Sequence, residues 1–202
     1  MKHTLLKHLL NFIVLALGAV FTALVIWLDV AVFKDGVQEI SATEILQELT
    51  LLAISGLFFL QAKKHPALRG GMILIGGFFF CMLIRELDAL FDQIHYGSWV
   101  YFASLIAVYC IVWACITPKT SLRGLSAFLA HPACHYMVCG LVLILVFSRV
   151  FGMNIIWKAV MQGDYVREVK NIVEEGTEMM GYLLCLGSAI AFRKRSEPLK
   201  TL

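Results

Sequence analysis

The chain has 202 residues, of which 60% are hydrophobic and 15% charged, and its mean hydropathy is +0.81. This composition excludes a soluble globular domain, which needs more charged surface, and a disordered chain, which lacks long apolar runs. The net charge of +3 comes from Lys and Arg residues gathered in particular loops, so it indicates membrane orientation and not nucleic-acid binding. We therefore expect an integral membrane protein with the lipid bilayer as its partner.

Apolar runs separated by short connections account for nearly the whole sequence. Crossing the hydrocarbon core takes about 20 helical residues, and only helices or closed barrels satisfy their backbone there. The predicted fold is therefore all-α, a polytopic membrane protein with six transmembrane helices in one bundle and a single domain over residues 1–202. The predicted helices are residues 9–28, 41–62, 70–92, 98–116, 136–157 and 171–192.

The first helix is expected to be an uncleaved anchor. Its apolar run is longer than the 7–15 residues typical of a signal peptide, and no clear cleavage site of small residues follows it. Trp27 and Asp29 mark its far interface. The second helix begins with a capping-box pattern, in which Ser41 is followed three residues later by Glu44.

Basic connections alternate along the chain with less basic ones. The basic stretches are residues 63–69, the loop 117–135 with Lys119 and Arg123, and the tail 193–195. Because Lys and Arg favour cytoplasmic loops, this pattern predicts cytoplasmic N- and C-termini in the cell (inner) membrane. Residues 122–129 are weakly amphipathic and are expected to lie along the inner interface.

Acidic residues are predicted to meet near the outer, periplasmic face, where the second and sixth helices begin and the third ends. A charged residue at the bilayer centre costs about 2.5–3.5 kcal/mol, so ionisable groups in membrane helices indicate a functional site. A single shared site explains why three predicted helices carry acidic residues at the same depth in the membrane. The predicted polar site consists of Glu48, Arg85, Glu86, Asp88, Asp92, Arg149, Glu175, Glu178 and Tyr182.

Arg149 is the expected counter-charge of this site. It lies about eight residues short of the predicted end of the fifth helix, near the depth of Glu86 and Glu178, and should pair with one of them. Arg149 and Arg85 cannot neutralise all the carboxylates, so a bound cation, protonation or a watery vestibule must meet the surplus. Oxygen ligands favour Mg, Ca, Mn or Fe. The predicted metal ligands are Glu48, Glu86, Asp88, Glu175 and Glu178.

Several of these residues also have purely structural interpretations. Glu44 can close the capping box, and Glu174 and Glu175 can favour the dipole of the first turn of the sixth helix. Asp92 and His95 can be ordinary interfacial loop residues.

An ion pair between Arg85 and Asp88 could likewise hold the third helix against a neighbour, and a buried ion pair by itself proves no chemistry. His131 and His135 are four residues apart, but Pro132 lies between them on the inner side, so we do not expect them to be ligands.

Three functional hypotheses follow. The first is a divalent-cation site near the periplasmic face, which would suit a metal-dependent membrane enzyme that acts on a lipid-like substrate. The second is a proton- or cation-coupled transporter, in which the same carboxylates load and release ions. The third is a non-catalytic subunit or sensor whose acidic vestibule receives a protein or ionic ligand. The sequence does not decide whether the protein is an enzyme.

Overall fold

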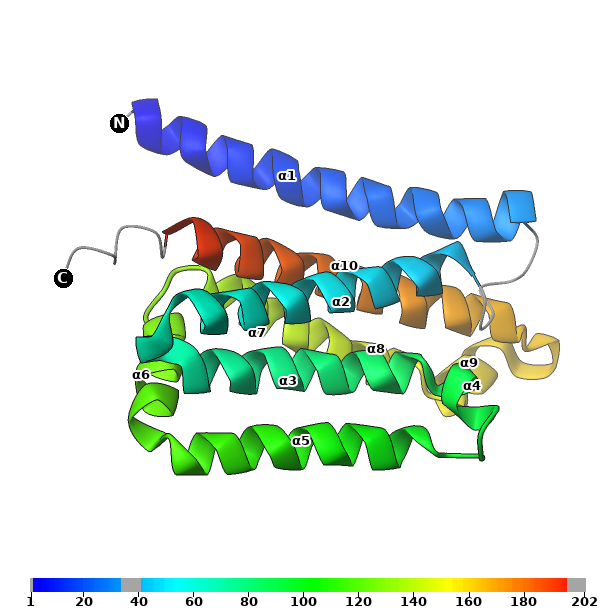
Figure 1. The fold of residues 1–202 in the computed structure, drawn as a ribbon. Coiled ribbons are helices and arrows are strands. Elements are labelled where there is room, and N and C mark those ends of the chain that lie inside the picture. The colour runs from blue at the N-terminus through cyan, green and yellow to red at the C-terminus, as the bar shows by residue number, and fades with distance from the viewer. Residues whose placement is uncertain (1, 34–40, 196–202) are drawn as a thin grey trace. The chain divides into compact units, whose positions relative to one another are not determined.

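The computed structural model describes residues 2–33 and 41–195, and these two ranges contain helices and turns but no strand (Figure 1). Most of the loop predicted between the first two helices lies outside them. The chain is therefore all-α over its described part. Helices long and apolar enough to cross a membrane are Leu5–Phe33, Ala42–Lys64, Pro66–Glu86, Trp99–Ile116 and Cys134–Phe151. A sixth crossing and the orientation of the termini stay predictions.

The chain divides into two compact units, and the prediction of a single domain is not tested by this division. Unit 1 comprises the described residues of Met1–Gln47 and Cys139–Leu184, and unit 2 those of Glu48–Val138 and Cys185–Leu202. All three boundaries fall inside helices, so three helices contribute to both units.

Unit 1 contains the first helix and the chain from Cys139 to Leu184. Its complete elements are α1 (Lys2–Trp27), the π-helix η1 (Leu28–Phe33), the π-helix η3 (Leu143–Phe147), α8 (Ser148–Phe151), α9 (Asn154–Met161) and the 3-10 helix η4 (Gln162–Asp164). It also holds the first residues of α2 (Ala42–Lys64), the end of α7 (Cys134–Val142) and most of α10 (Arg167–Arg195).

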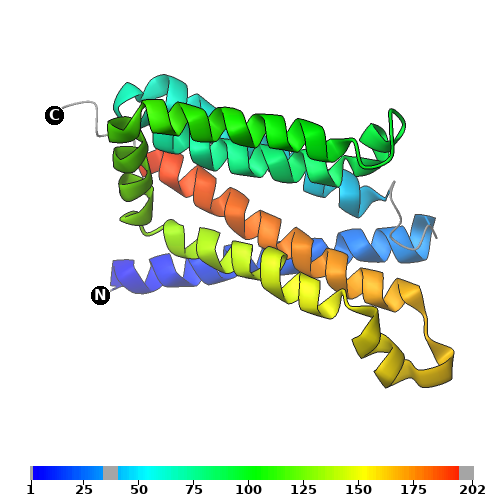
Figure 2. The same ribbon diagram turned by 90° about the horizontal axis from the view of Figure 1, so that it is seen from below.

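Unit 2 is built around two long helices that lie side by side (Figure 1). These are α3 (Arg69–Glu86) and α5 (Trp99–Ile116), and the shorter α6 (Pro118–Leu129) packs across one end of α3, as Figure 2 also shows. The remaining complete elements are the 3-10 helix η2 (Pro66–Leu68) and α4 (Asp88–Asp92).

The third predicted helix, residues 70–92, is not continuous. It is interrupted at Leu87, whose backbone has φ −83° and ψ 19°, and a separate short helix, α4, begins at Asp88. The break coincides with the end of the apolar run, where burial no longer favours helix continuation. Asp88 then lies in the first turn of α4, where a carboxylate interacts favourably with the helix dipole.

The fifth predicted helix, residues 136–157, ends early. Helical backbone runs from Cys134 only to Phe151, and Met153 is extended before α9 begins. Trp157 spans this break, because its Nε1 donates a hydrogen bond of 2.5 Å to the carbonyl oxygen of Phe151. Beyond the break, α9 and η4 turn away from α8 before the chain enters α10 (Figure 2).

The sixth predicted helix, residues 171–192, is longer than expected, since α10 extends over Arg167–Arg195. The second and fourth predicted helices differ from α2 and α5 by no more than two residues at either end. The first, residues 9–28, is extended at both ends by α1 and η1.

Two glycines let α6 approach α3 at backbone distance. A Cβ atom on Gly124 would lie 2.8 Å from the Cα of Gly71 and still nearer to the carbonyl oxygen of Leu68. A Cβ atom on Gly71 would lie 2.5 Å from the backbone nitrogen of Leu125. Because the obstructing atoms are backbone, no side-chain rotation can relieve the clash. The position of α6 in unit 2 therefore depends on these glycines.

We expect Gly124→Ala to lower the free energy of unfolding by about 1–3 kcal/mol, since the added methyl must push two backbones apart. Thermal unfolding of the detergent-purified protein, followed by circular dichroism, measures this change. Gly56→Ala is the matched control, because a Cβ atom at Gly56 in α2 meets nothing within 4 Å. An equal loss of stability in both variants would contradict this account of the α3–α6 contact.

Candidate functional site

Asp29 joins the end of the first helix to the beginning of α2. Its side chain lies in the π-helix η1 and is completely buried. One carboxylate oxygen accepts a 2.9 Å hydrogen bond from the backbone N–H of Ala42, and the other accepts bonds from the N–H and hydroxyl of Thr43 at 2.9 and 2.5 Å. Ser41 adds a cap by accepting a 3.2 Å bond from the N–H of Glu44. The Ser41 cap is the one that the capping-box pattern predicts.

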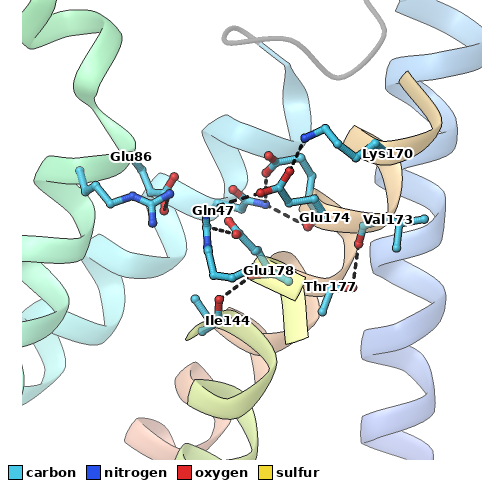
Figure 3. Close-up of polar contacts among 12 residues, drawn as sticks. Gln47, Glu86, Ile144, Lys170, Val173, Glu174, Thr177 and Glu178 are labelled. Carbon is cyan, nitrogen blue, oxygen red and sulfur yellow. Dashed lines mark hydrogen bonds and ion pairs between the residues drawn. The ribbon is translucent and has the colours of Figure 1, made fainter. Parts of the chain in front are cut away.

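The centre of unit 1 is a chain of ion pairs between α8 and α10. Lys170 lies 2.6 Å from Glu174, which also lies 3.5 Å from Arg149, and Arg149 forms a second ion pair with Glu178 (Figure 3). Arg149–Glu178 is one of the two pairs that the sequence predicts for this arginine. In this chain two cations balance two carboxylates, so the four side chains are together neutral.

The two partners in the last pair differ greatly in exposure. The side chain of Glu178 is 2% exposed, whereas that of Arg149 is 42% exposed. A buried carboxylate without a counter-charge is costly, so the burial of Glu178 depends on its ion pair with Arg149. Arg149 in contrast reaches the surface of unit 1 and has Glu174 as a second acidic partner.

Gln47 links α2 to the same turns of α10. Its Nε2 donates hydrogen bonds of 3.1 Å to the backbone carbonyl and to a carboxylate oxygen of Glu175 (Figure 3). Gln47 is fully buried, and its Oε1 has no hydrogen-bond partner among the described residues. Tyr182, one turn beyond Glu178 on α10, is also fully buried. Unit 1 thus brings together two residues of the predicted polar site, Glu175 and Glu178, and the side-chain amide of Gln47, which was not predicted to belong to the site.

Local backbone features place Arg149 beside Glu174 and Glu178. The π-helix η3 directly precedes α8, and π-helical turns are rare and frequently occur at functional sites. The buried hydroxyl of Ser148 donates a 2.5 Å bond back to the carbonyl of Ile144 within this segment. After α8, Gly152 leaves room for the Glu174 carboxylate, whose Cδ would lie 2.6 Å from a Cβ atom at that position. Arg149 is therefore in the last turn before the break and not two turns inside the helix, as the sequence predicts.

In unit 2, the predicted site residues are arranged differently. Arg85 and Glu86, adjacent at the end of α3, form an ion pair of 3.4 Å. Glu48 on α2 is half-buried and lies within electrostatic range of Glu86, so these two predicted residues are brought together.

The residues after the break in α3 lie in a turn. Asp88 is exposed, and Asp92 accepts a 2.7 Å hydrogen bond from the backbone N–H of Gly97. His95 is exposed, and its Nδ1 lies 2.9 Å from the carbonyl oxygen of Tyr96. For Asp92 and His95 these contacts fit the alternative interpretation as interfacial loop residues.

Among residues 2–33 and 41–195, no group of three or more His, Cys, Asp or Glu side chains could hold a metal ion. The predicted metal ligands belong to both units, with Glu48, Glu86 and Asp88 in unit 2 and Glu175 and Glu178 in unit 1. The metal site stays a prediction.

Sequence reasoning omitted Asp29, Gln47, Lys170 and Glu174 from the site. Lys170 had a usable signal, because Lys170, Glu174 and Glu178 recur at intervals of four and so share one helix face. Asp29 follows a membrane-length run directly, which marks it as an interfacial charge but does not reveal its hydrogen-bond partners. Gln47 is uncharged and has no comparable signal.

No protein-family model matches the chain, and neither a curated protein nor a solved structure matches it.

We expect Asp29→Asn to lower the free energy of unfolding by about 1–2 kcal/mol. The amide replaces one of two acceptor oxygens with a donor, which weakens the cap on α2 and removes its charge. Thermal unfolding in detergent measures the loss. Asp164→Asn, a change at an exposed residue of η4, is the control and should leave stability unchanged. Equal stability of Asp29→Asn and the parent would contradict a structural role for this carboxylate.

Proposed function

We propose that the chain is an inner-membrane protein with six crossings and cytoplasmic termini, and that it responds to cations through the ion-pair chain of unit 1. Its apolar helices and alternating basic stretches support the membrane assignment. The proton is the first cation to consider, because each carboxylate of the chain can accept one. A proton-coupled transporter and a proton sensor are the two forms that this function can take.

One observation carries the proposal: Glu178 is buried, but its counter-charge Arg149 is half-exposed and shared with Glu174. A proton on Glu178 removes the charge that holds Arg149 there, and Glu174 remains as the alternative partner. Glu178 pairs with Arg149 on α8, Arg149 also pairs with Glu174 on α10, and Glu174 pairs with Lys170. Proton uptake by Glu178 would therefore shift Arg149 toward Glu174, with which it already forms an ion pair.

The backbone around Arg149 supports a movement of this kind. The short helix α8 is the last turn of the helical segment Cys134–Phe151, between the π-helix η3 and the break at residues 152–153, so it is continuous with helical backbone on one side only. Trp157 is bonded to the end of α8 and would report its displacement. A change in the charge of Glu178 would then move Arg149, and with it the segment 148–157.

We expect the fluorescence of Trp157 to change in a single transition as pH is lowered, because protonation of Glu178 releases Arg149. The measurement uses a variant with Trp27, Trp99 and Trp113 replaced by Phe, reconstituted in lipid nanodiscs. Adding Glu178→Gln should abolish the transition.

The matched control adds Glu168→Gln instead, a change at an exposed carboxylate in the first turn of α10, and should keep the transition. A pH response that persists unchanged in the Glu178→Gln background would contradict the proposal.

A divalent-cation site in unit 1 is the second candidate, and the Oε1 of Gln47 specifically favours it. This oxygen is buried, has no hydrogen-bond partner among the described residues, and belongs to a side chain bonded to Glu175. Amide and carboxylate oxygens are ligands that Mg and Ca prefer. A bound metal could polarise a lipid-like substrate, which would make the protein a membrane enzyme.

Elemental analysis of the purified protein after growth with added Mg, Ca, Mn and Fe tests this candidate. A metal site predicts about one equivalent of metal in the parent, lost in the double variant Glu175→Gln, Glu178→Gln, because two charged carboxylate ligands would become neutral amides. The double variant Asp164→Asn, Glu168→Gln removes the same charge and should retain the metal. A parent without metal under these conditions would reject the candidate.

A further inference from the structure

Unit 2 contains a group of exposed basic residues in stretches of the sequence that have no acidic residue. No Asp or Glu occurs between Glu48 and Glu86, between Asp92 and Asp164, or in the stretch 179–196. The same three stretches contain a set of exposed cations. These are Lys63, Lys64, Arg69, Lys119, Arg123, Arg193 and Lys194, all within unit 2.

The fold brings these distant cations to one place through an aromatic cluster. Phe192 near the end of α10 packs against Phe128 of α6, with ring centroids 5.2 Å apart, and against Phe58 of α2 at 6.4 Å. Phe58 and Phe128 are themselves 5.6 Å apart. The cations on α6, at the end of α2 and directly after Phe192 therefore emerge around a common core.

Arg69 belongs to the same rim, since its Nε donates a 3.3 Å bond to the carbonyl of Ala62 in the last turn of α2. The contact of Gly124 with Leu68 and Gly71 fixes α6 beside this turn. We call the seven exposed cations the basic rim.

The outer face of α6 combines charge with apolar surface. Lys119, Leu122, Arg123 and Leu129 are all exposed, the two leucines by 69% and 65%. The opposite face buries Ser121, Gly124 and Phe128 against the rest of unit 2. Cations next to exposed leucines on one face are typical of a helix that lies in the headgroup region of a membrane.

We propose that the basic rim, with α6 at its centre, is a binding site for anionic phospholipid headgroups. The charge complementarity is one-sided, because no carboxylate in these three stretches of sequence competes with the lipid phosphate. Lys119 and Arg123 bind the phosphates, while Leu122 and Leu129 contact the first carbons of the acyl chains. This inference is independent of the function proposed for unit 1.

The experiment is native mass spectrometry of the detergent-purified protein titrated with dioleoyl-phosphatidylglycerol or dioleoyl-phosphatidylcholine. We expect the parent to bind phosphatidylglycerol at least about fivefold more tightly, the effect of one cation near an anionic headgroup. The double variant Lys119→Gln, Arg123→Gln should lose most of this preference. The charge-preserving variant Lys119→Arg, Arg123→Lys should keep it.

The matched control is Lys158→Gln, Arg167→Gln, which removes the same charge from exposed residues of unit 1. If the α6 variant does not fold, Lys63→Gln, Lys64→Gln at the end of α2 is judged by the same criterion. Equal binding of the two lipids by the parent would overturn the proposal. So would a control that loses the preference as fully as the variant of the rim, because net charge alone would then explain the binding.

Discussion

A carboxylate buried among apolar helices has to be paired, and the arrangement of unit 1 depends on that requirement at Glu178. The apolar surroundings that exclude water from Glu178 also make the loss of Arg149 expensive. Lys170 and Glu174 extend the pair into a neutral chain, so Arg149 serves two carboxylates without leaving a net charge. The break after α8 and the small residue at position 152 make room for this chain.

The charged side chains of the two units have different surroundings. In unit 1, opposite charges meet on facing helices and satisfy one another. In unit 2, the exposed cations of the basic rim lie at helix ends and along α6, around a core of aromatic rings and glycine contacts. These exposed cations need no internal counter-ions, because water hydrates them and anions outside the protein can balance their charge.

The sequence predicts the helices well because the thickness of a bilayer requires long apolar runs, which are visible in composition alone. It also predicts the Ser41 cap and the Arg149–Glu178 pair. It does not predict the breaks at Leu87 and residues 152–153, since hydropathy does not report where a helix changes direction. The hydrogen bonds of Asp29 to Ala42 and Thr43 depend on how two helix ends meet, which no local pattern records.

The π-helix before α8 has a consequence for the direction in which Arg149 points. A π-helical turn holds one residue more than an α-helical turn, so it is equivalent to a single-residue insertion in an otherwise regular helix. If residues 143–147 adopted regular α-geometry without losing a residue, everything beyond them would rotate by about 100° around the helix axis. Arg149 would then face away from Glu178. The ion pair therefore depends on the π-turn that absorbs the additional residue as much as on the identity of its two side chains.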